Sequence, residues 1–170
     1  MGDVPVIDKL VYIFLLLLVC CTHRAAMASS YANLFETGRA LLVIKSQSVT
    51  IGDLEFPAHR CRQDEKFECV ISTSFRFSVP KGIDARKEWN HLGARYQALA
   101  NRQIILRGEL IEYQLIRQTI SESVVDFLYS DQLGVIGVKA ADGVDLMLLE
   151  ECGFAATRPR VSPYVNCAVP

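Results

Sequence analysis

Few of the residues and motifs that signal a known chemistry occur in this chain. Its 170 residues include three histidines and one tryptophan. It has no glycine-rich phosphate-binding loop, no nucleophile elbow, no HExxH zinc motif and no CxxC pair. The formal net charge is -1, so the chain lacks the basic field that attracts nucleic acid. The sequence therefore predicts no catalytic residue, no cofactor, no metal site and no nucleic-acid partner.

Apolar residues, in contrast, are plentiful. The hydrophobic fraction is 51% and the charged fraction is 22%. This balance is typical of a globular protein and excludes a disordered or low-complexity chain. At this length we expect one domain with a single hydrophobic core.

The N-terminal segment has the pattern of an export signal. Residues 10–21 are all apolar, which is short for a membrane span of about 20 residues but fits the apolar region of a secretory signal. Ala26-Met27-Ala28 then supplies the small-x-small pattern that precedes a cleavage site. The sequence predicts a signal peptide over residues 1–28, cleaved after Ala28, and a secreted or periplasmic protein.

Two alternatives for this segment stay open. Asp3 and Asp8 precede the apolar run with only Lys9 to balance them, whereas a signal normally begins with net positive charge. An uncleaved membrane anchor or a lipid on Cys20 or Cys21 is therefore also compatible with the sequence. In either case the membrane is reached only through this segment.

The remaining cysteines number four, and an even number in an exported chain indicates disulfides. Short spacing favours Cys61–Cys69 and Cys152–Cys167 over the two other connectivities. The second bond would tie back a proline-rich tail over residues 152–170. Free buried thiols are one alternative, and metal or redox chemistry at Cys61 and Cys69 with His59 and His91 is the other.

The middle of the chain contains segments whose apolar residues alternate, as in strands, and one segment whose apolar residues have helical spacing. Residues 67–79 alternate between apolar and polar, which predicts one long strand with a core face and a solvent face. Residues 40–45 and 48–56 also have strand composition. Residues 84–101 place apolar side chains, including Trp89, at steps of four and three, which predicts an amphipathic helix.

Short strand-like segments follow at 103–107, 110–120, 124–129, 135–140 and 144–149, with Asp and Gly at two of the joints. Residues 110–120 also fit a helix, although a strand is favoured. The predicted fold is α+β, an antiparallel β meander with one long amphipathic helix packed on it, in a single domain over residues 29–151. A helix followed by a four-stranded meander resembles cystatin-like folds in element order alone.

Two features are candidate binding surfaces. Ser72, Ser74 and Arg76 fall on the predicted solvent face of the long strand, and small hydroxyls around an arginine suit a carboxylate. Arg60 and Arg62 lie in the loop that the Cys61–Cys69 bond would constrain, and a constrained loop is less costly to order on binding. Solvent-exposed polar residues with no ligand are the plainer interpretation of both.

The function that these patterns favour is an exported, disulfide-stabilised, non-enzymatic binding protein with a protein partner, for instance an inhibitor or immunity-type protein. A membrane-tethered envelope component is one alternative. The other is a small extracytoplasmic hydrolase that uses paired carboxylates. Its candidate pairs are Glu109 with Glu112, Asp142 with Asp145, and Glu150 with Glu151.

Overall fold

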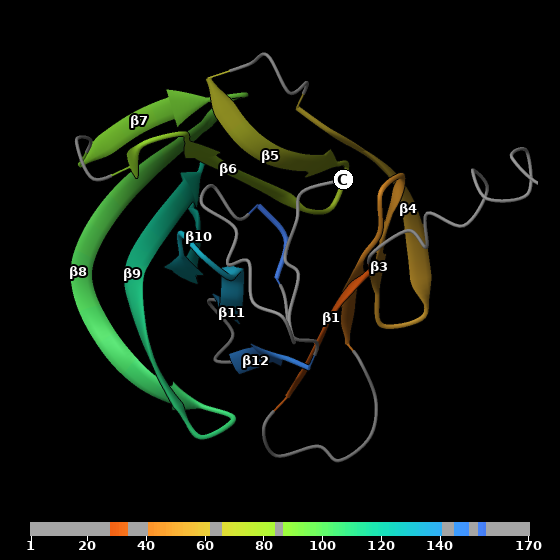
Figure 1. Ribbon diagram of the computed structural model, residues 1–170. Helices are drawn as coiled ribbons and strands as arrows, with labels where there is room; N and C mark the ends of the chain where they lie inside the picture. Colours follow the sequence, from red (N-terminus) through yellow and green to blue (C-terminus); the bar gives the residue numbers. More distant parts are fainter. Residues whose placement is uncertain are drawn as a thin grey trace, which may run out of the picture.

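The computed structural model describes residues 28–33, 41–61, 66–83, 87–140, 145–149 and 153–155. Over these residues the chain is all-β, with twelve strands in one antiparallel sheet that nearly closes into a barrel (Figure 1). These ranges contain no helix long and apolar enough to cross a membrane. The predicted signal segment up to Met27, the loop residue Arg62, and both Cys152 and Cys167 lie outside the described residues.

The strands follow one another around the sheet, each antiparallel to its neighbours. The spatial order is β6-β5-β4-β3-β2-β1-β12-β11-β10-β9-β8-β7. The first and last strands therefore pair, with Tyr31 opposite Leu148, and the two edges of the sheet are the consecutive strands β6 and β7. The strands are β1 (Ser29–Asn33), β2 (Leu42–Ile44), β3 (Ser48–Ile51), β4 (Leu54–Arg60), β5 (Phe67–Ser72), β6 (Arg76–Pro80), β7 (Glu88–His91), β8 (Ala94–Leu106), β9 (Glu109–Ile120), β10 (Ser123–Ser130), β11 (Gly134–Ala140) and β12 (Asp145–Leu148).

The prediction of a helix over residues 84–101 is wrong, and with it the α+β class and the cystatin-like element order. The described part of this range forms β7 and the first half of β8, joined by a two-residue turn. Leu92 and Gly93 both have positive φ, 52° and 76°, which is the turn geometry that matches the twist of paired strands. Trp89 lies opposite Tyr96 across this hairpin with the rings stacked 5.4 Å apart.

The single strand predicted over residues 67–79 is also wrong, because the chain reverses in its middle. β5 and β6 pair with each other and are joined by a turn over residues 73–75. The Ser72 hydroxyl accepts hydrogen bonds from the backbone N–H groups of Ser74 and Phe75, at 3.3 and 2.9 Å. A serine side chain thus stabilises a turn that contains neither glycine nor proline.

Strands predicted in the second half of the chain are confirmed. β9, β10, β11 and β12 match the segments 110–120, 124–129, 135–140 and 144–149, and they pair in sequence order. β8 and β9 are the longest strands and form the strongly curved hairpin on one side of the barrel (Figure 1).

Aromatic side chains fill part of the barrel interior. Phe77 is fully buried, and its ring centroid lies 4.7 Å from that of Phe127 and 5.4 Å from that of Phe154. Phe154 belongs to the short segment 153–155, which is held by hydrogen bonds from Gly153 N to Leu133 O and from Val135 N to Phe154 O. This segment therefore contributes an aromatic ring to the centre of the core.

Side chains rather than a backbone ladder connect the two edge strands. Trp89 Nε1 of β7 donates to Ser78 O of β6 at 3.1 Å, and the Ser78 hydroxyl lies 2.7 Å from His91 Nδ1. Gln118 Nε2 of β9 donates to Arg76 O of β6 at 2.7 Å. These bonds satisfy carbonyl groups of the β6 edge, which would otherwise be buried without partners.

The predicted disulfide between Cys61 and Cys69 is confirmed. It links the residue after β4 to the paired strand β5, with Cα atoms 5.1 Å apart. The alternative of a metal site on these two cysteines is wrong, because neither thiolate is available. The described ranges contain no cluster of three or more His, Cys, Asp or Glu side chains that could hold a metal ion.

Removing this disulfide is expected to lower the free energy of unfolding by about 2–3 kcal/mol, since a short loop would regain its freedom in the unfolded chain. The Cys61→Ala variant breaks the bond and keeps the buried sulfur of Cys69. Urea unfolding of this variant and of the reduced wild type should give similar losses. A difference below about 0.5 kcal/mol from the oxidised wild type would contradict the expectation.

Candidate functional site

An apolar pocket of about 390 Å³ lies between inward-facing side chains from both halves of the sheet. This volume is within the range of about 300–1,000 Å³ that is typical of small-molecule sites. Most of the lining is apolar, and the polar groups come from the β5–β6 turn, β6, β9 and β10. The lining residues are Leu42, Ile51, Ser72, Thr73, Ser74, Phe75, Arg76, Gln118, Ile120, Ser123, Val125, Phe127, Val138, Ala140 and Leu146.

Strand alternation explains why the walls are apolar. Val125 and Phe127 are two residues apart on β10, and Val138 and Ala140 are two apart on β11, so each pair faces the same side of the sheet. Leu146 continues this surface on β12. The pocket is thus the part of the barrel interior that the aromatic core leaves open.

Arg76 is the one ionisable side chain among the described residues that line the pocket. It is the first residue of β6, directly after the turn, and Nη1 donates a hydrogen bond to Leu92 O across the β6–β7 edges. Its Nε atom is buried and has no hydrogen-bond partner. No ion pair joins Arg76 to a carboxylate within the described ranges.

Gln118 fixes the backbone next to this arginine. Its side chain is buried, and Nε2 donates both to Arg76 O and to the hydroxyl of Tyr96, the latter at 2.8 Å. Burial raises the pKa of Tyr96 to about 12, although the Gln118 hydrogen bond and the charge of Arg76 oppose the rise. Tyr96 is therefore a neutral phenol at physiological pH, and Arg76 supplies the charge at the pocket.

The structure brings three of the predicted binding residues together and separates the others. Ser72, Ser74 and Arg76 all line the pocket. They do not share a solvent face as predicted, because Ser72 is buried and stabilises the turn. Arg60 ends β4 away from this lining, and burial is the main cause that lowers its pKa, against the attraction of Glu68.

Sequence reasoning missed Gln118 and the apolar walls. Gln118 lies between Ile116 and Ile120 on β9, at a position where alternation places an inward side chain. A polar residue at such a position was the available signal. The apolar walls gave no signal in the sequence, because Val125 and Val138 have the pattern of ordinary core residues.

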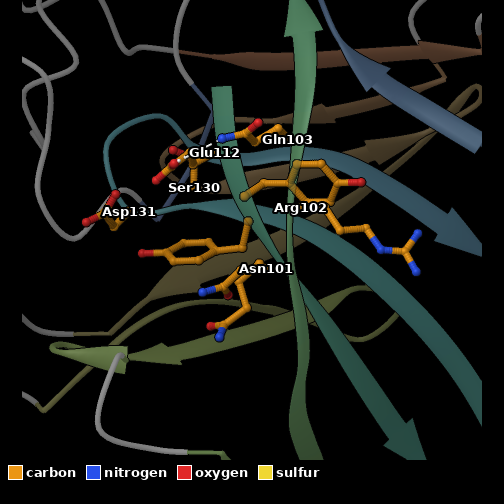
Figure 2. Close-up of a pocket in the computed structure, with 9 residues that line it drawn as sticks. Asn101, Arg102, Gln103, Glu112, Ser130 and Asp131 are labelled. Atoms are coloured by element: carbon orange, nitrogen blue, oxygen red, sulfur yellow. Dashed lines mark hydrogen bonds between the residues drawn. The ribbon is translucent and has the colours of Figure 1, made fainter. Parts of the chain in front are cut away.

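A second, polar hollow of about 600 Å³ lies between the outer part of the β8–β9 hairpin and the β10–β11 turn (Figure 2). Glu112 and Asp131 line it together with amide side chains, and the guanidinium of Arg102 points away from Asp131. Gln103 Nε2 donates to Glu112 Oε1 at 3.2 Å. The Oε1 atom of Gln114 is buried there without a hydrogen bond.

Only one of the three predicted carboxylate pairs, Glu109 with Glu112, lies fully within the described residues, and the structure does not bring its members together. Glu109 and Glu112 are three residues apart on β9, so they project from opposite faces and cannot act on one bond. Asp145 lies 3.7 Å from Lys139 on the neighbouring strand. Asp142, Glu150 and Glu151 lie outside the described residues.

Comparison of the chain with protein-family models, with curated proteins and with solved structures finds no match in any of the three. The geometry of the two hollows is therefore the basis for assigning a function.

Proposed function

We propose that this protein is an exported, disulfide-stabilised binding protein that holds a small, largely apolar molecule inside its barrel. The observation that carries the proposal is the apolar pocket of about 390 Å³ between the two halves of the sheet. A pocket with apolar walls and few polar groups is the usual form of a small-molecule site.

The packing around the pocket supports a ligand. Elsewhere the interior is filled by buried aromatic rings such as Phe77, Tyr129 and Phe154. Protein interiors are normally close-packed, and apolar side chains that line an open hollow lack part of those dispersion contacts and face water instead. An apolar molecule in the pocket would restore those contacts to Val125, Val138 and Leu146.

A small ligand suits this site better than the protein partner expected from the sequence. The pocket is a concave hollow lined by residues of one chain and open to solvent at Thr73, Ser74 and Ser123, whereas standard protein interfaces bury about 800 Å² on each partner. Export is supported by the apolar run at residues 10–21, the Ala26-Met27-Ala28 pattern and the Cys61–Cys69 bond, since disulfides persist in oxidising compartments.

Calorimetric titration with straight-chain alcohols from hexanol to dodecanol tests the proposal. We expect saturable binding, and we expect Ala140→Phe to weaken it at least tenfold because the new ring occupies the pocket. Ala100→Phe is the matched control, because Ala100 is exposed on β8, and it should bind as the wild type does. Absence of binding at every chain length, or equal affinity in both variants with unchanged thermal unfolding, would contradict the proposal.

A further inference from the structure

We propose that the ligand of this pocket is an amphipathic carboxylate, with its acyl chain against the apolar walls and its carboxylate on Arg76. This inference rests on the proposed function and adds the chemical class of the ligand. It comes from the environment of one side chain, which has unused hydrogen-bonding capacity next to an apolar cavity.

The hydrogen-bond donors of Arg76 are only partly used. A guanidinium carries five N–H donors in a planar fork, and here Nη1 bonds to Leu92 O while Nε–H is buried without an acceptor. Because protein atoms cover Nε, a carboxylate in the pocket would accept from the remaining N–H donors of the two Nη groups, a paired geometry that arginine favours.

The charge of the site also favours an anion. The described lining residues carry no acidic side chain, and Arg76 has no ion pair to a carboxylate in the described part of the chain. Attraction between opposite charges is stronger beside apolar walls than in water. A neutral ligand would leave this positive charge without compensation.

The shape of the pocket favours one apolar chain. Val125, Val138 and Leu146 form a continuous apolar wall, and Arg76 lies beside the polar turn at residues 73–75. A ligand with one charged end and one flexible apolar end matches this division. A single arginine suits a carboxylate, because the doubly charged phosphate group normally gathers several cationic or N–H donors.

Calorimetry with decanoate and with decanol at pH 8, where the fatty acid is ionised, separates the contribution of the charged group to the affinity from that of the acyl chain. We expect the wild type to bind decanoate more tightly than decanol. The Arg76→Met variant keeps an unbranched side chain without charge, and it should lose about 10–100-fold in decanoate affinity. Its affinity for decanol should stay within about twofold, which also shows that the pocket is intact.

Arg117→Met is the control for loss of one positive charge, because Arg117 is paired with Asp126 on an exposed surface. It should leave both affinities unchanged. The inference is overturned if the wild type prefers decanol, or if Arg76→Met weakens both ligands equally or neither. Decanol binding without a role for Arg76 would leave the proposed function standing, whereas absence of binding by either probe would remove both.

Discussion

Replacement of Gly153 by alanine is expected to lower the free energy of unfolding by about 3–5 kcal/mol, the range typical of losing a large buried aromatic side chain. A Cβ at this position would lie 1.9 Å from Val135 O and 2.9 Å from Leu133 O, and both are backbone atoms that cannot move aside cheaply. The segment 153–155 would have to move away from Leu133 and Val135, to which it is hydrogen-bonded. Phe154, which is 2% exposed, would then leave the core.

Denaturant unfolding of matched variants tests this expectation. Gly82→Ala is the control, because Gly82 has a φ of 86° but open space around the added carbon, so only backbone strain of about 1–2 kcal/mol is expected. Gly153→Ala and Phe154→Ala should cost similar amounts, and the double variant should cost little more than either. Fully additive losses would show that Gly153 does not hold Phe154 in place.

Replacement of Gln118 by leucine is expected to lower the free energy of unfolding by about 2–4 kcal/mol. The change leaves Arg76 O and the Tyr96 hydroxyl without their donor, and each buried polar group left unpaired costs about 1–3 kcal/mol. Loss of this hydrogen bond also removes a contribution that lowers the pKa of Tyr96. The tyrosine absorbance of the folded variant should therefore titrate at higher pH than in the wild type.

Gln97→Leu is the matched control, because the Gln97 side chain bonds to Glu88 at an exposed position. Its effect on unfolding should stay within about 0.5 kcal/mol. If the two leucine variants were equally stable, the hydrogen bonds from Gln118 would not hold β6 against β9. The closure of the barrel would then have to come from the apolar core and from the contacts of Trp89 and His91 with Ser78.

Local sequence signals were sufficient for the second half of the sheet. β9 to β12 have strand composition and short connections between them, so each pairs with the strand next to it in the chain. Closure of the barrel depends on contacts between distant residues. Tyr31 of β1 pairs with Leu148 of β12, and no local pattern predicts that partnership.

The helix prediction failed because helical spacing and pairing across a hairpin can place the same residues together over a short range. Trp89 and Tyr96 are seven residues apart, which is two helical turns, yet they are also opposite positions of a hairpin. Burial decides between them: Ala94, Tyr96 and Ala98 are buried at every second position, while Leu92 and Leu99 are exposed. The Leu92-Gly93 turn was the overlooked signal.

The candidate site was partly predictable. Ser72, Ser74 and Arg76 were selected because hydroxyls near an arginine suit a carboxylate, and all three line the pocket. Their position in a pocket was not predictable from the sequence. The pocket forms only because β5 and β6 make a hairpin and because the curvature of the sheet places β9–β12 across from that hairpin. Gln118 acquires its role only in that closed arrangement.

The most direct test of the account is to locate a bound fatty acid by isotope-edited NMR, using methyl-labelled protein and unlabelled decanoate. We predict nuclear Overhauser contacts from the acyl chain to the methyl groups of Val125, Val138 and Leu146 within the pocket. Contacts confined to the exposed side chains of Ile105 and Leu110 at the end of the β8–β9 hairpin would contradict the proposed site.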